Sequence, residues 1–143
     1  MKTGRILQAF ALLFYLGSYA LADTLKNPTE ARELADRAMK KVGEGDLEGG
    51  LLLTKPFLNI PVAEFEVALN QMRAQTPAMT IRFGKSIGFE FISQSSLGES
   101  LLRFVYIHRF ETHAMRWSFI FYRTSKGWVL DTFKTDDDPR QWF

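Results

Sequence analysis

The 143-residue chain contains no cysteine and only two histidines. The lack of cysteine excludes disulfide bonds, so the fold depends on a hydrophobic core of its own. An N-glycosylation site is also missing, because Asn27-Pro28-Thr29 has proline where it is forbidden. After residue 22 no apolar run approaches the ~20 residues that span a bilayer. These absences predict a soluble product with no stable membrane insertion.

Residues 1–22 match the pattern of a secretory signal peptide. A basic start, an apolar middle and small residues before a cleavage site are supplied by Lys2 and Arg5, residues 6–16, and Ala20-Leu21-Ala22. We expect cleavage after Ala22, which leaves a single domain at 23–143. An uncleaved anchor is the alternative, but the apolar run is short for a spanning helix. Without cysteine or glycosylation sites, the sequence favours a bacterial periplasm or secretion.

Cleavage would change the charge balance of the chain. The full sequence has 18 basic and 16 acidic residues, and Lys2 and Arg5 are the only charged residues before position 23. The remaining domain is therefore formally neutral. Nucleic-acid binding depends on an excess of lysine and arginine, so we expect no nucleic acid as a partner.

The first half of the domain predicts helices. Asn27 is a good N-cap, Pro28 suits the first helical position, and Glu30 completes a capping box. Apolar residues then recur at helical spacing as far as Val42, and Gly43 is a natural stop.

Two further helices are expected before the middle of the chain. A short one covers 47–54 and is interrupted by Pro56. Another opens at Pro61 and carries an apolar stripe, and Pro77 is expected to end it.

The second half changes to the period of β-strands. Four segments rich in aromatic and β-branched residues are expected to form strands, at 87–95, 100–110, 115–123 and 128–134. Their short links predict an antiparallel meander. We therefore predict an α+β fold, with N-terminal helices packed on a curved antiparallel sheet of four or more strands. The core spans 28–134 and a tail covers 135–143.

Alternation along the strands separates an inner from an outer face. The inner face is expected to hold large apolar residues, namely Phe89, Phe91, Leu102, Phe104, Tyr106, His108, Phe110, Met115, Trp117, Phe119, Phe121, Trp128 and Leu130. The outer face is unusually apolar for a solvated surface, with Val105, Ile107, Ile120, Tyr122, Val129 and Phe133 among Arg103, Arg109, Arg116 and Asp131. Such a face predicts a homodimer interface, or cover by a terminal segment. Trp142 and Phe143 are expected to fold back onto the domain.

The strand pattern resembles a known superfamily. The run Phe121-Tyr122-Arg123-Thr124-Ser125-Lys126-Gly127-Trp128-Val129-Leu130 joins an aromatic strand, a Lys-Gly-Trp turn and a final apolar strand, and Gly45-Asp46-Leu47 turns ahead of a proline-opened helix. Over most of 28–134 the chain resembles the nuclear transport factor 2-like superfamily, and in particular small exported members of undescribed role. The resemblance implies a cystatin-like α+β cone with a pocket between sheet and helices. Members include cofactor-free isomerases and dehydratases, ligand binders and interaction modules, so fold alone selects no function.

Several short motifs fail on context. Gly84-Lys85-Ser86-Ile87-Gly88 matches a nucleophile elbow, but a strand follows the serine where a helix is required. We interpret it as a turn. His108, Glu111 and His113 match no helical zinc spacing, and Asp136-Asp137-Asp138 lacks the pattern of a calcium loop. No metal or cofactor is expected.

The best functional candidates are Tyr106 and His108, with Trp117, Phe119 and Trp128 as ligand-contacting walls. A histidine in an apolar pocket could act as a general base. No inward-facing carboxylate is evident as its partner, so a hydrogen-bonded core pair is favoured. The sequence therefore predicts an exported, non-catalytic binding or interaction module for a small apolar ligand or a protein partner. The alternatives are a cofactor-free isomerase or dehydratase that uses His108 and Tyr106, and a structural envelope dimer.

Overall fold

A computed structural model describes residues 22–143 of the chain, so the predicted signal peptide lies outside the described residues except for Ala22. The helical elements are α1 (Pro28–Gly43), α2 (Leu47–Thr54), the short 3-10 helix η1 (Lys55–Phe57), α3 (Val62–Phe83) and a second 3-10 helix, η2 (Pro139–Gln141). The strands are β1 (Ser86–Leu97), β2 (Leu101–Phe110), β3 (Ala114–Thr124) and β4 (Gly127–Asp136). They form one antiparallel sheet in the order β1-β2-β3-β4. The predicted α+β fold with a four-stranded meander is confirmed.

Helix α1 begins and ends as its sequence indicates. The Asn27 side chain accepts a hydrogen bond from the Glu30 backbone N–H at 2.9 Å, and the Glu30 carboxylate accepts one from the Lys26 N–H at 2.7 Å. At the other end Gly43 lies against β1, where an added Cβ would stand 2.9 Å from the Gly88 carbonyl carbon. Glycine is required there because the helix and strand backbones approach so closely.

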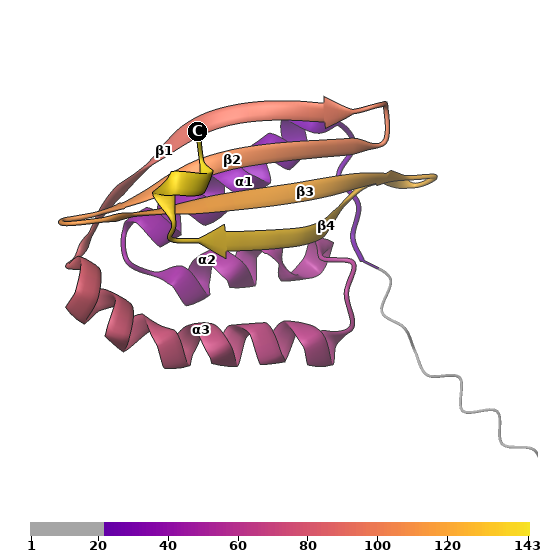
Figure 1. Cartoon of the computed structure of the whole chain (residues 1–143). Coiled ribbons are helices and arrows are strands. Elements are labelled where there is room, and N and C mark those ends of the chain that lie inside the picture. The colour runs from indigo at the N-terminus through magenta and orange to yellow at the C-terminus, as the bar shows by residue number, and fades with distance from the viewer. Residues whose placement is uncertain (1–21) are drawn as a thin grey trace, which may run out of the picture.

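One face of the sheet packs on the helices. Figure 1 shows the curved sheet lying over α1 and α2, with α3 beyond α2 for most of its length. Phe104, Tyr106, Phe119 and Phe121 of the sheet are fully buried on this inner face, as the alternation predicted. None of the helices within residues 22–143 is both long and apolar enough to cross a membrane.

Helix α3 corrects one prediction, because Pro77 lies inside it and does not end it. Proline removes the N–H that would bond the carbonyl of Arg73. Pro77 is exposed, so water can bond that carbonyl. The hydroxyls of Thr76 and Thr80 add local bonds to the carbonyls of Met72 and Thr76, at 2.8 and 3.1 Å.

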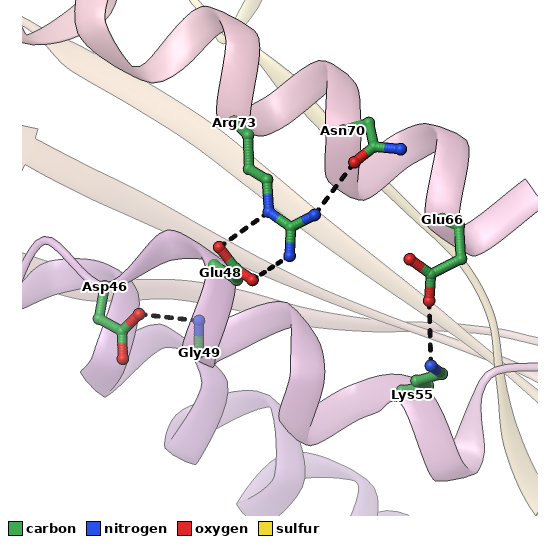
Figure 2. Close-up of polar contacts among 7 residues, drawn as sticks. All are labelled: Asp46, Glu48, Gly49, Lys55, Glu66, Asn70 and Arg73. Atoms are coloured by element: carbon green, nitrogen blue, oxygen red, sulfur yellow. Dashed lines mark hydrogen bonds and ion pairs between the residues drawn. The ribbon is translucent and has the colours of Figure 1, made fainter.

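Polar contacts join α3 to α2 (Figure 2). The Arg73 guanidinium donates to both carboxylate oxygens of Glu48 and to the side-chain oxygen of Asn70. Lys55, in η1, forms an ion pair with Glu66 at 3.1 Å. All four ion-pair side chains are more than two-fifths exposed, so these contacts orient α3 but add little to the free energy of unfolding.

A β-bulge in β4 corrects a second prediction. Phe121 pairs with Leu130 but Ile120 pairs with Thr132, which leaves Asp131 as the extra residue. Beyond the bulge the parity of β4 is inverted. Phe133 therefore pairs with Phe119 and packs against the core, and does not lie on the outer face as predicted.

The β4 edge of the sheet is partly covered by segments from the first half of the chain. Leu25 and Trp128 exchange two backbone hydrogen bonds of 2.8 Å, and the Asn59 N–H donates to the Leu130 carbonyl at 2.9 Å. These bridges place residues 22–25 and the turn before α3 beside β4.

Candidate functional site

The predicted site residues come together on the inner face, but in a closed core. Tyr106 and His108 lie on β2, Trp117 and Phe119 on β3, and all four are at most 1% exposed. Trp128, at 6% exposure, borders a hollow of about 770 Å³ between the β1–β2 and β3–β4 turns. A ligand from solvent therefore has no direct access to the first four side chains in this conformation.

Tyr106 has a carboxylate partner that the sequence analysis missed. Its hydroxyl donates to Asp36 Oδ1 of α1 at 2.7 Å, and the Arg32 side chain donates to the same oxygen at 2.8 Å. The Arg32 guanidinium lies 3.4 Å from the centroid of the Phe91 ring. Burial and the bond to Asp36 raise the pKa of Tyr106 far above its usual value. The phenol thus stays protonated and ties α1 to β2.

His108 has a different partner. Its Nε2 lies 2.7 Å from the Oγ of Ser86, the first residue of β1 and not part of a turn as interpreted from the sequence. Its ring also lies 4.0 Å from that of Phe110. Burial lowers the pKa of His108 to about 4, so the imidazole is neutral at physiological pH. Within the described residues, His108 Nδ1 and Trp117 Nε1 have no hydrogen-bond partner.

The Ser86–His108 pair borders solvent, but within residues 22–143 no third group orients the histidine. Ser86 lines a hollow of about 300 Å³ with Thr76, Met79 and Thr80 of α3. An activated serine needs a base that can take up its proton and a third group that orients that base. No such group bonds His108 Nδ1 among residues 22–143. Protonation would also place a cation in an apolar core, which the lowered pKa disfavours.

The two histidines that were considered and rejected as metal ligands lie in separate surroundings. His113 Nε2 lies 3.0 Å from the Asp137 carbonyl oxygen, and its ring packs on Phe83 with centroids 4.4 Å apart. His108 is held by Ser86. Across residues 22–143, no three His, Asp or Glu side chains form a group suited to a metal ion.

The outer face of the sheet carries a groove of about 580 Å³. Its apolar lining comes from Ile92, Val105, Ile107 and Ile120, and Arg103, Arg116 and Lys134 supply positive charge. Arg103, Val105, Ile107, Arg116 and Ile120 were all predicted on the outer face from the alternation of the strands. The apolar side chains are half-buried or exposed, because α1, α2 and α3 do not cover this side of the sheet and the short η2 lies only at its margin.

The C-terminal tail closes one side of the groove. Trp142 and Phe143 both line it. The Trp142 indole N–H donates to the Asp136 carboxylate, and the Arg116 side chain donates to the same carboxylate at 2.9 Å. Trp142 folds back as predicted, whereas Phe143 is fully exposed and the prediction is wrong for that residue. The exposed Phe143 ring lies at the border of the groove.

No protein-family model, curated protein or solved structure matches the chain. The resemblance to the nuclear transport factor 2-like superfamily therefore stays a prediction, and the function rests on the geometry of the chain itself.

Proposed function

We propose that the protein is a non-catalytic binding module that acts through the outer face of its sheet. One observation carries the proposal: the four predicted site residues at the centre of the inner face are closed off from solvent, whereas the outer face offers an apolar groove within reach of solvent. Its volume of about 580 Å³ falls in the range of about 300–1,000 Å³ that is usual for small-molecule sites.

The proposal includes two expectations from the sequence. The chain is exported to a periplasm or secreted, on the basis of residues 1–22. It is a divergent relative of the nuclear transport factor 2-like superfamily, because helices precede a curved antiparallel meander in both. The site proposed on this chain is the outer face and not the interior of the cone.

The isomerase or dehydratase alternative finds less support. The Tyr106 hydroxyl donates a hydrogen bond to Asp36, and both Tyr106 and His108 are fully buried, so neither side chain is directly accessible to a substrate. A proton-transfer site needs its acid and base within hydrogen-bond reach of the substrate.

A matched pair of variants tests the proposal. Ile120→Thr removes an apolar contact from the groove, and Ile81→Thr makes the same change at an 87% exposed position on α3. We expect the neutral probe Nile red to fluoresce with the natural chain and to bind several-fold more weakly to Ile120→Thr. Ile81→Thr should bind it like the natural chain. Equal binding by all three chains would show that the groove is not the site.

A structural homodimer through the same face is a second candidate. It is favoured by the apolar side chains of this face: Val105 and Ile107 are successive outward residues of β2, and Ile120 of β3 lies diagonally from Val105. Sedimentation velocity over a range of concentrations tests it. A monomer at high micromolar concentration excludes the dimer, whereas a dimer that Ile120→Thr dissociates establishes it.

A further inference from the structure

We propose that the groove on the outer face binds a single-chain anionic amphiphile, such as a free long-chain carboxylate. The inference rests on the proposed function and names its ligand class. The alkyl chain lies on the apolar stripe of β2, and the anionic head lies between Arg103 and Lys134.

The apolar stripe follows from the strand register. Val105 and Ile107 are alternate residues of β2, so their side chains point to the same face. Ile120 of β3 pairs with Arg103, and Ile92 approaches the groove from β1. Arg103, Val105 and Ile107 occupy about 13 Å of β2, so the groove is elongated along the strand, with a cation at one end and an aliphatic side chain at the other.

The cations flank one polar position. Ser118 of β3 pairs with Val105 on one side and with Lys134 on the other. Arg103 precedes Val105 by two residues and faces the same way. Arg103 and Lys134 thus stand on opposite sides of β3, two strand spacings apart and offset by two residues along the strands, which separates their backbones by about 12 Å. A carboxylate near the Ser118 hydroxyl would lie between both charges.

The two charges are available to a ligand. Arg116, the third cation of the groove, pairs with Asp136 at 2.9 Å. Among residues 22–143, neither Arg103 nor Lys134 forms an ion pair, and both are exposed. A carboxylate therefore offsets one of the two unpaired positive charges without displacing an existing partner.

The same charges favour this ligand over a second copy of the chain. A twofold contact through the sheet presents the same surface from both subunits. Arg103 and Lys134 would then approach the equivalent cations of the other copy, which disfavours association. Trp142 and Phe143 also close one side of the groove, so the face is less suited to flat sheet-on-sheet packing.

Binding of dodecanoate, below its micelle concentration, tests the inference. In methyl NMR spectra of the purified chain, we expect saturable shifts for Val105, Ile107 and Ile120, with smaller shifts for the distant Val67. Arg103→Gln and Lys134→Gln should each weaken binding about two- to fivefold, the usual range for an exposed charge pair. Lys126→Gln removes an exposed cation from the β3–β4 turn and should leave the affinity unchanged.

Two outcomes would overturn the inference while the proposed function stands. Equal affinity for neutral dodecyl maltoside would show that the head group is not recognised. Binding of Nile red in the groove without any binding of dodecanoate would show that the ligand is not an anionic amphiphile.

Two other outcomes would replace it with another occupant. Groove methyl shifts that grow with protein concentration alone would assign the face to a second copy. Binding to phosphatidylglycerol vesicles without binding of dodecanoate would assign it to a bilayer surface. Circular dichroism of each variant distinguishes a lost contact from a lost fold.

Discussion

Helices α1 and α3 are attached to the molecule in contrasting ways. Helix α1 has 16 residues, of which seven are buried, whereas only three of the 22 residues of α3 are buried. Helix α1 lies on the sheet and shares the Tyr106–Asp36 hydrogen bond with it. Helix α3 is held by Phe65, Leu69 and Phe83 and by the exposed ion pairs in Figure 2. The length of a helix therefore does not indicate how much it stabilises the fold.

The largest difference between α1 and α3 is expected when an apolar side chain of each helix is shortened to alanine. Leu34 of α1 is 1% exposed and Val67 of α3 is 57% exposed. We expect Leu34→Ala to lower the free energy of unfolding by about 4 kcal/mol, because it leaves a cavity under the sheet. Val67→Ala should change it by less than about 0.5 kcal/mol. Urea denaturation measures both, and similar losses would refute the contrast.

The core between α1 and the sheet should also respond to acid. The pKa of His108 is about 4 when folded, against 6.5 for an unperturbed histidine. Between these values the unfolded state binds more protons, so the free energy of unfolding should fall by about 3 kcal/mol as the pH drops from 6.5 to 4.

The variant His108→Gln isolates this titration, because glutamine does not titrate but can still bond Ser86. Between pH 6.5 and pH 4, its free energy of unfolding should decrease less than that of the natural chain. Identical pH profiles for the two chains would mean that His108 is not the group responsible.

The bond between α1 and β2 has a smaller expected effect. Tyr106→Phe removes the hydroxyl that donates to Asp36 but keeps the ring in the core. We expect a loss of about 1.5 kcal/mol, in the range for hydrogen bonds to charged groups. Tyr122→Phe is the matched control, because Tyr122 is 43% exposed on the outer face. Thermal denaturation should separate the two variants.

The smallest effect is expected from the α2–α3 ion pair. Glu48→Gln weakens the contact with Arg73, at a position where solvent screens the charges. The global unfolding midpoint should not move measurably. Amide hydrogen exchange should become faster in α3 and stay unchanged in α1. Glu33→Gln, on the exposed side of α1, should change neither.

Local patterns predicted most of the elements. Asn27 and Pro28 fixed the start of α1, and alternation placed Phe104, Tyr106 and Phe119 inside. The prediction that Pro77 ends α3 was wrong, because the cost of proline in a helix depends on whether water can replace the lost hydrogen bond. The prediction that Phe133 lies on the outer face was wrong, because a β-bulge depends on how two strands pair and the pattern of one strand does not reveal it.

The candidate site was harder to predict than the elements. Asp36 meets Tyr106 across 70 positions of sequence, and Ser86 meets His108 across 22. Helical spacing does not indicate which polar residue at the margin of a buried face will bond a distant strand. The apolar residues between two arginines on β2 indicated an unusual outer face. The groove itself could not be predicted, because one of its sides is formed by Trp142 and Phe143 of the folded-back tail.

The pairing of Leu25 with Trp128 has a consequence for the order of assembly. The two residues are joined by reciprocal backbone bonds, although 103 positions separate them along the chain. A polypeptide released N-terminal end first, from a ribosome or a translocation channel, exposes Leu25 long before Trp128 emerges. The apolar face of α1 is likewise covered only after β2 is available to pack against it. Closure of the domain is therefore a long-range step that requires nearly the whole of residues 25–128 to be available.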